Sequence, residues 1–165
     1  MAQDITLPIE DGYVNLRVGA IIEKNGKLLM VRNADLLYCY SVGGRIQFGE
    51  SAEDAIRREV LEETGWDLEI ESLGFVHEDF FWGDSPAKLG KLIYEIGFYY
   101  YMKTPADFEP RCDSLTEDGT EEQLEWVDPA EDRLIYPDFF HTALQDRVPY
   151  VRHILKDERN IPKQS

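Results

Sequence analysis

The segment Gly43–Trp66, GGRIQFGESAEDAIRREVLEETGW, joins a glycine-rich loop to a stretch with the signals of a short helix. Ser51 precedes this stretch and Asp54 follows three residues later, an arrangement that resembles a capping box. Gly65 stands where a C-terminal cap belongs, because glycine readily adopts the left-handed conformation that ends many helices. These signals predict one helix over residues 52–64.

Three glutamates of this predicted helix, Glu59, Glu62 and Glu63, fall at positions i, i+3 and i+4. A helix turns by about 100° per residue, so the three carboxylates share one face. Glu63 points between the apolar residues Ile56 and Val60, and we expect the acids to point inward. Carboxylates beside a core are costly unless they are paired or bind a cation, and hard oxygen ligands favour Mg²⁺ or Mn²⁺. A solvated acidic surface is the alternative interpretation.

The loop before the predicted helix supplies further candidates. Three glycines between residues 43 and 49 bracket a tight loop that leads into the helix N-terminus. Exposed backbone groups at such a position can meet a phosphate or a metal. Arg58 can reach Glu62 one turn further on, or Glu50 in the loop. An orienting role and an ordinary surface ion pair are both open for Arg58.

Together these residues resemble the Nudix box, the signature of the Nudix (MutT-like) hydrolases. The matching positions are Gly44, Glu50, Arg58, Glu59, Val60, Glu62, Glu63 and Gly65. The resemblance implies an α/β (α+β) fold, a Nudix-like α/β/α sandwich with a mixed central sheet and a catalytic loop–helix, in a single domain over residues 1–165. Two positions depart from the family pattern, Trp66 in place of an aliphatic residue and Val42 in place of a frequent proline, and we expect changed packing there.

The resemblance also implies an activity: metal-dependent hydrolysis of the pyrophosphate linkage in a small nucleoside diphosphate derivative. Nucleoside triphosphates, ADP-ribose and nucleotide sugars are the candidate substrates. The residues that it assigns to the metal, Mg²⁺ or alternatively Mn²⁺, are Gly43, Glu59, Glu62 and Glu63. Glu50 and Arg58 would orient these ligands. Gly44 and Arg45 are the candidates for contact with the substrate.

Family members differ in which carboxylate outside the box acts as general base or completes the metal shell. The candidates here are Glu95, Glu121, Glu122 and Glu125. Glu125 stands beside Trp126, as an acid does in some MutT-like members, and it ranks level with Glu122. Ordinary solvation is the alternative for each of these acids.

An aromatic group, Phe80, Phe81 and Trp82, falls in a predicted loop between two long strands, where a nucleobase could stack. Core packing is the alternative for these rings. The further elements predicted from periodicity and turn residues are strands at 13–22, 27–32, 38–42, 66–77, 91–101 and 124–127, a type I′ turn at Asn25-Gly26, and one or two helices at 137–146 and 150–157.

Composition limits the partners. The chain has 165 residues and a net charge of −16, so a nucleic acid polymer is excluded as a partner, because such binding relies on basic residues. A small phosphorylated nucleotide stays possible if a cation lies between its phosphates and the acids. No apolar run approaches the roughly 20 residues of a membrane span, and no secretory signal is apparent, so we expect a cytoplasmic protein. The resemblance also makes a homodimer possible.

Two alternatives to a hydrolase stay open on the same fold. A nucleotide-sensing or metal-binding module without catalysis is the first, although such modules usually lose box acids that this chain keeps. An isomerase of isoprenoid diphosphates is the second, and it needs a catalytic cysteine in surroundings that Cys39 lacks. Cys39 and Cys112 are expected to be buried or half-buried thiols, without a disulfide or a zinc site.

Overall fold

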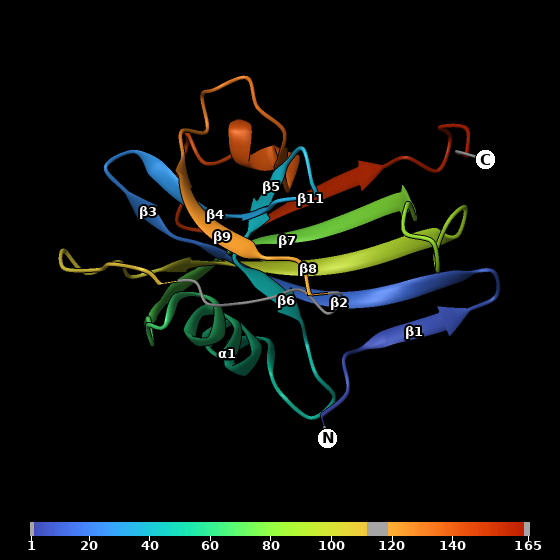
Figure 1. The fold of residues 1–165 in the computed structure, drawn as a ribbon, viewed down its shortest axis with the longest axis horizontal. Coiled ribbons are helices and arrows are strands. Elements are labelled where there is room, and N and C mark those ends of the chain that lie inside the picture. The colour runs from blue at the N-terminus through green and yellow to red at the C-terminus, as the bar shows by residue number, and fades with distance from the viewer. Residues whose placement is uncertain (1, 112–118, 164–165) are drawn as a thin grey trace.

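This computed structural model describes residues 2–111 and 119–163. These residues form two β-sheets, one α-helix, a short 3-10 helix and the loops that connect them (Figure 1). The helices are α1 (Ala52–Thr64) and η1 (Asp138–His141). The strands are β1 (Thr6–Ile9), β2 (Gly12–Ile21), β3 (Glu23–Lys24), β4 (Lys27–Asn33), β5 (Cys39–Ser41), β6 (Gly43–Arg45), β7 (Ile70–Trp82), β8 (Leu92–Met102), β9 (Glu122–Val127), β10 (Ile135–Tyr136) and β11 (Arg152–Asp157).

The larger sheet is mixed and has the order β1-β2-β8-β7-β11, with β6 paired to β2. β2 runs parallel to β8 and β11 runs parallel to β7, whereas β7 and β8 are antiparallel. The smaller sheet has the order β10-β5-β4-β3, with β9 paired to β4. The predicted α/β class with a mixed sheet is confirmed.

Both faces of the larger sheet are covered near the middle of the molecule. Because side chains alternate along β2, Val18 belongs to a hydrophobic cluster with Ile56 of α1, while Ile21 belongs to a second cluster with Phe140 of η1. The helix α1 therefore covers one face and the η1 segment covers the other. Further along β2, β8 and β7, the strands extend beyond both covering layers (Figure 1).

The helix predicted over residues 52–64 is confirmed, together with both of its caps. The Ser51 hydroxyl accepts a hydrogen bond of 3.1 Å from the Asp54 backbone N–H, and the Asp54 carboxylate accepts one of 3.2 Å from the Ser51 N–H. Gly65 has a φ of 74° and its N–H donates to the Leu61 carbonyl over 2.9 Å. The loop before the helix is thereby fixed in its direction of entry.

Several predicted strands are confirmed within two residues, including those at 13–22, 27–32 and 38–42. The Asn25-Gly26 turn is also confirmed in position, since both residues have positive φ, 53° and 76°. The strand predicted from residue 66 starts only at Ile70. Cys39 is buried as expected. Cys112 and residues 114–118 of the acidic stretch lie outside the described residues.

One prediction about the C-terminal half and one about a loop are wrong, and the helix predicted at 137–146 is only partly right. Residues 152–157 form β11, because their half-buried side chains alternate with exposed ones and Arg152 pairs in register with Phe75 of β7. Within 137–146 the only helix is the short η1. The aromatic group Phe80–Trp82 belongs to β7, because that strand and β8 pair as far as Trp82 and Leu92. Neither described helix is long and apolar enough to cross a bilayer.

Candidate functional site

Two adjacent glycines of β6 allow α1 to lie directly against the backbone of the sheet. Gly43 has a φ of 146°, and a Cβ atom there would lie 2.2 Å from the carbonyl oxygen of Val18. At Gly44 a Cβ atom would lie 2.4 Å from Oε1 of Glu59. Gly43 needs glycine, because its φ is positive and backbone atoms leave no room for a side chain, whereas at Gly44 the nearby atoms belong to the movable end of Glu59. The Glu59 carboxylate therefore rests on the backbone of the loop.

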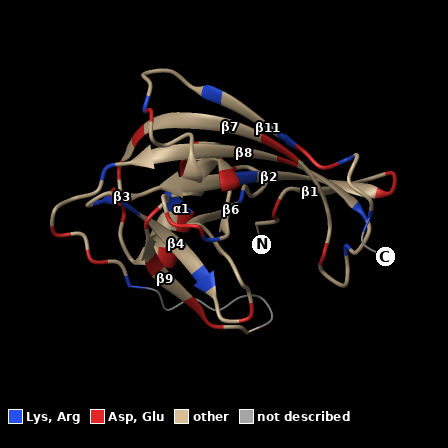
Figure 2. Cartoon of the chain, turned by 90° about the horizontal axis from the view of Figure 1, so that it is seen from above, with Lys and Arg blue, Asp and Glu red and all other residues tan. Residues whose placement is uncertain are grey.

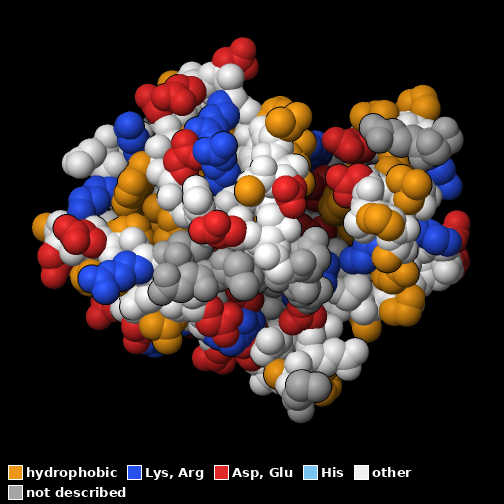
Figure 3. All heavy atoms as spheres, viewed as in Figure 1, with side chains coloured by type: hydrophobic (Ala, Val, Ile, Leu, Met, Phe, Trp, Pro, Cys, Tyr) orange, Lys and Arg blue, Asp and Glu red, His pale blue; other side chains and the backbone are white. Residues whose placement is uncertain are grey.

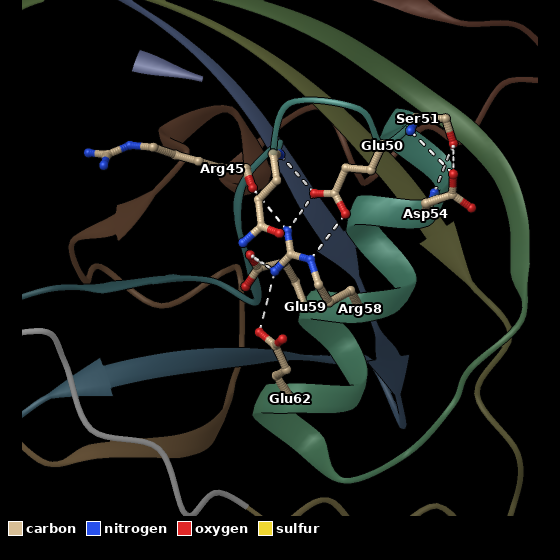
Figure 4. A network of polar contacts seen from close by, with 8 residues as sticks. Arg45, Glu50, Ser51, Asp54, Arg58, Glu59 and Glu62 are labelled. Atoms are coloured by element: carbon tan, nitrogen blue, oxygen red, sulfur yellow. Dashed lines mark hydrogen bonds and ion pairs between the residues drawn. The ribbon is translucent and has the colours of Figure 1, made fainter. Parts of the chain in front are cut away.

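Arg58 gathers the acids around the first turns of α1 (Figure 4). It donates to both carboxylate oxygens of Glu50, from Nη2 over 2.7 Å and from Nε over 3.1 Å. Its Nη1 donates to Oε1 of Glu59 over 2.6 Å and reaches Oε2 of Glu62 at 3.4 Å. Its Nη2 also donates to the Arg45 carbonyl over 3.1 Å. The hydrogen bonds from Arg58 lower the pKa of Glu50, so this guanidinium joins the loop to the helix.

The three glutamates of the box occupy different surroundings. The side chain of Glu59 is 14% exposed, whereas that of Glu62 is 58% exposed. The expectation that all three acids point inward is therefore wrong for Glu62. At about 100° per residue, Glu62 lies on the side of Glu59 away from the buried Val60, and Glu63 lies on the near side. Burial raises the pKa of Glu59, although Arg58 opposes the shift.

Glu63 has the most strained electrostatic surroundings of the three. Its Oε2 atom is shielded from solvent and has no hydrogen-bond partner among the described residues. Burial raises the pKa of Glu63 well above its ordinary value, and the carboxylates of Glu59 and Glu122 raise it further. Arg17 and a backbone hydrogen bond from Gly43 act in the opposite direction without cancelling the shift. A cation at this position would be stabilised by all of these acids.

Glu122 of β9 faces the helix. Side chains alternate along the strand, and Glu122 shares its face with Leu124 and Trp126, which pack against the cluster that contains α1. The hydroxyl of Tyr40 donates a hydrogen bond to Oε1 of Glu122. Together with the electrostatic effect of Glu122 on Glu63, this orientation brings one acid from outside the box to the site.

Glu125 points to the other face of β9. Arg133 binds its carboxylate with two hydrogen bonds, from Nη1 over 2.7 Å and from Nη2 over 2.9 Å, and these lower the pKa of Glu125. The same guanidinium lies 3.1 Å from the sulfur of Cys39, a buried thiol whose pKa burial raises. Of the two remaining candidates, Glu121 is exposed, and Glu95 lies on β8, where it accepts a hydrogen bond from Asn15.

Arg17 of β2 is a basic residue next to the site that the sequence reasoning did not single out. It lies directly opposite Arg45 in the pairing of β2 with β6. Burial opposes charging, but Glu95, Glu63 and Glu59 together raise the pKa of Arg17. Because two guanidinium groups on adjacent strands repel each other, an anion between them would be favoured. The available signal was a charged residue inside an alternating apolar strand.

Arg17 and Arg45 are basic residues in a chain whose net charge is strongly negative. Acidic residues are spread over loops and strands around the molecule, with fewer basic residues between them (Figure 2). Arg45 forms a long ion pair with Asp4, with 3.9 Å between Nη1 and Oδ2. Its side chain extends away from the Arg58 network (Figure 4). Two arginines on neighbouring strands therefore offer positive charge beside an otherwise acidic site.

The aromatic group at the end of β7 is divided between the two faces of the sheet. Phe80 stacks on Tyr94 with ring centroids 4.3 Å apart, and Arg159 lies 4.2 Å from its ring centre. The Trp82 indole N–H donates to the Ile161 carbonyl over 3.0 Å. These two rings are engaged by other parts of the chain, whereas Phe81 points to the opposite face by the alternation of the strand.

The donor set around α1 fits a hard divalent cation. Glu59 and Glu63 offer carboxylate oxygens, Gly43 offers a backbone carbonyl, and the Glu63 oxygen without a partner is the kind of atom that a cation satisfies. In the described residues no three histidine, cysteine, aspartate or glutamate side chains are gathered closely enough to form a complete metal cage. Glu62 is exposed, and the carboxylate of Glu59 accepts a hydrogen bond from Arg58.

Comparison with known proteins identifies the class to which this fold and box belong. The chain matches the NUDIX domain family over residues 15–141, so it belongs to that family and the predicted resemblance is confirmed. An ADP-ribose pyrophosphatase of Methanocaldococcus jannaschii is 39% identical over 59 residues, which cover 34% of this chain and 35% of that protein. A MutT-like protein of Streptomyces ambofaciens is 34% identical over 61 residues, covering 37% of this chain and 40% of that protein.

The matched segments thus span two fifths or less of these curated relatives. The whole fold is shared more widely. The crystal structure of the mutator MutT protein from Bacillus halodurans superposes with a TM-score of 0.57 at 16% identity, covering 92% of this chain and 95% of that one.

Proposed function

We propose that this protein hydrolyses the pyrophosphate linkage of a small nucleoside diphosphate derivative with the help of Mg²⁺, or alternatively Mn²⁺. The observation that carries the proposal is the buried, unpaired Oε2 atom of Glu63, placed beside Glu59 and Glu122. The mutual repulsion of these neighbouring acids is relieved when a cation binds beside them. The names of the relatives, an ADP-ribose pyrophosphatase and a MutT-like protein, support the same substrate class.

The residues of α1 and the loop before it would hold the cation. Glu59, Glu63 and the Gly43 carbonyl would hold the cation, with Glu62 able to join them, and the cation supplies charge neutralisation and a more acidic bound water. Arg58 positions Glu59 through its hydrogen bond of 2.6 Å. These assignments follow the chemistry of the donor set.

The substrate and the water are handled by residues on the sheets. Arg17 and Arg45 would bind phosphate oxygens, because they stand opposite each other on β2 and β6. Gly44 leaves room beside the loop for the Glu59 carboxylate. The water oxygen attacks one phosphorus, the bond to the bridging oxygen breaks, and its electron pair leaves on that oxygen. Glu122 would accept the proton of the attacking water at its carboxylate, which Tyr40 orients.

A substrate panel tests the proposal. Nucleoside triphosphates, ADP-ribose, nucleotide sugars and dinucleoside polyphosphates are incubated with the protein and Mg²⁺ or Mn²⁺, and the released phosphate or nucleoside monophosphate is measured. We expect metal-dependent release from at least one of these compounds. Nucleotide-dependent thermal stabilisation without any release would instead identify a sensing module of the same fold.

The two acids of β9 provide a matched pair of variants. Glu122→Gln is expected to lower kcat by about 10²-fold or more, because it removes the proposed proton acceptor and a neighbour of Glu63. Glu125→Gln, three residues away and bound to Arg133, is expected to change kcat by less than about threefold. Steady-state rates with the best substrate of the panel measure both effects. The reverse order of the two losses would assign the proton acceptor to Glu125.

Replacing Gly44 by alanine is expected to lower activity much more than stability. The added methyl group meets the movable end of the Glu59 side chain, so we expect a loss of about 1 kcal/mol or less in the free energy of unfolding. A displacement of about 1 Å at a reacting centre lowers a rate by on the order of 10²-fold. Urea unfolding curves measure the effect on stability, and kcat values measure the effect on activity. An unchanged kcat would show that the position of Glu59 does not matter for catalysis.

A further inference from the structure

A row of polar side chains crosses the larger sheet two residues before Arg17 along β2. The pairing of the strands places Asn15 of β2 next to Glu95 of β8, Glu95 next to Asp79 of β7, and Asp79 next to Lys156 of β11. Paired residues point to the same face, so the four side chains form one continuous row. The row lies next to η1, because Lys156 forms an ion pair with Asp138, the first residue of that helix.

The hydrogen bonds within the row leave acceptors unused. The Asn15 amide donates from Nδ2 to Oε2 of Glu95 over 3.3 Å. Lys156, the cation at the end of the row, is shared between Asp138 and Glu158 at 3.3 Å each. The Oδ1 atoms of Asn15 and Asp79 are shielded from solvent and have no partner among the described residues. Two acceptors of the row are therefore not satisfied by the donors within it.

The burial of these groups makes the missing partners costly. Asn15 is only 3% exposed, and the neighbouring His77 is 4% exposed with its Nε2 atom unpaired as well. Burial raises the pKa of Asp79 to about 7, with Glu95, Glu158 and Asp138 adding to the shift and Lys156 opposing it. A buried acceptor without a partner is unfavourable, so binding of a ligand that brings donors to these atoms is favoured.

The row adjoins the site on α1. Arg17 follows Asn15 by two residues on the same face of β2, and it interacts electrostatically both with Glu95 in the row and with Glu59 and Glu63 of the helix. Asp79 and Glu95 are both partly accessible. Seen from the same side as Figure 1, the surface has a hollow in which acidic side chains are visible, beside the projecting ends of the strands (Figure 3).

We propose that Asn15, Glu95 and Asp79 bind the non-phosphate end of the substrate through two adjacent hydrogen-bond donors. A cis-diol of a sugar and the N–H groups of an amino-substituted base both present such a pair of donors. The inference rests on the proposed function and deepens it, because Arg17 would hold the phosphates while the row holds the other end of the substrate. A site built to pair with donors discriminates strongly against analogues that lack them.

Equilibrium binding tests the proposal without turnover. Calorimetric titrations of the full-length protein compare GMP with IMP, which lacks the 2-amino group, and AMP with purine riboside monophosphate, which lacks the 6-amino group. A second arm compares GMP and AMP with their 2′,3′-dideoxy forms. We expect a tenfold or greater loss of affinity in one arm, and that arm identifies whether the base or the diol supplies the donors.

Variants of the row connect the discrimination to these residues. Asp79→Leu and Glu95→Gln are expected to bind the intact nucleotide about tenfold or more weakly, and to bind the donor-lacking analogue as the wild type does. Asp107→Asn, at an exposed position outside the row, is the matched control and should bind like the wild type. Glu95→Gln keeps the size of the side chain, so it answers the question even if Asp79→Leu folds poorly.

Two outcomes would overturn the proposal. The first is wild-type discrimination in both variants of the row. The second is an equal loss of affinity for every ligand, including inorganic pyrophosphate, which would mean a general disturbance of the site. A protein that hydrolyses nothing in the substrate panel but discriminates between these monophosphates through Asp79 and Glu95 would refute the proposed function and leave this subsite standing.

Discussion

Glu63→Gln is expected to lower kcat by about 10³-fold or more and, in metal-free buffer, to raise the free energy of unfolding. Glutamine keeps the shape of the side chain but removes the charge that would bind the cation, and several kcal/mol of transition-state stabilisation depend on that cation. The same change relieves the repulsion with Glu59 and Glu122 and the burial of a charge. Steady-state kinetics and urea unfolding at neutral pH measure the two effects.

Glu53 provides the control for this prediction. It is an exposed glutamate in the first turn of the same helix, so Glu53→Gln should leave kcat unchanged and alter stability by less than about 0.5 kcal/mol. A Glu63→Gln protein that keeps the wild-type rate would contradict the proposed function. One that loses both activity and stability would show that Glu63 acts through a structural contact.

Arg58→Ala is expected to destabilise the protein by about 2–3 kcal/mol and to lower kcat by about 10- to 100-fold. The variant leaves the Glu50 and Glu59 carboxylates without their shared partner, and both are largely shielded, with side-chain exposures of 17% and 14%. The loss of rate follows because residues that orient metal ligands contribute on this scale. Arg58→Lys should recover only part of either effect, because an ammonium cannot bind Glu50 with two hydrogen bonds.

The neighbouring Arg57 makes an unusually close control. It also binds both carboxylate oxygens of Asp67, through hydrogen bonds of 2.8, 2.9 and 3.2 Å, but this pair is more than half exposed. Arg57→Ala should therefore cost about 1 kcal/mol or less and leave kcat unchanged. Denaturant unfolding and rate measurements on both variants give the comparison. Equal losses in the two variants would show that the Arg58 network has no special role.

The helix and its loop could be predicted from the sequence because their determinants are local. Ser51, Asp54 and Gly65 act within a few residues of the backbone that they cap, and the three glutamates follow from the fixed rotation of a helix. The exposure of the individual glutamate side chains on this helix was harder to predict. The outward position of Glu62 depends on which side of α1 the sheet covers, and that is decided by packing against β2 and β6.

Residues brought together from distant parts of the chain could not be predicted in the same way. The choice between Glu122 and Glu125 depends on which face of β9 meets α1, although the alternation of Leu124 and Trp126 was a usable signal. Arg17 meets Arg45 only through the pairing of β2 with β6. The helical prediction for residues 150–157 failed because pairing with β7, a contact distant in sequence, overrides local preference.

The position of β11 has a consequence for how the protein is made. β11 pairs with β7, whose residues precede it by about 77 positions in the register, for example Arg152 with Phe75. On the ribosome the β7 edge therefore stays open while every other described element has already emerged, and an open strand edge is a template for association with other chains. Pairing over such a separation is also slow. Once β11 pairs, it covers Phe75–Phe80 of β7 and becomes the edge of the sheet itself.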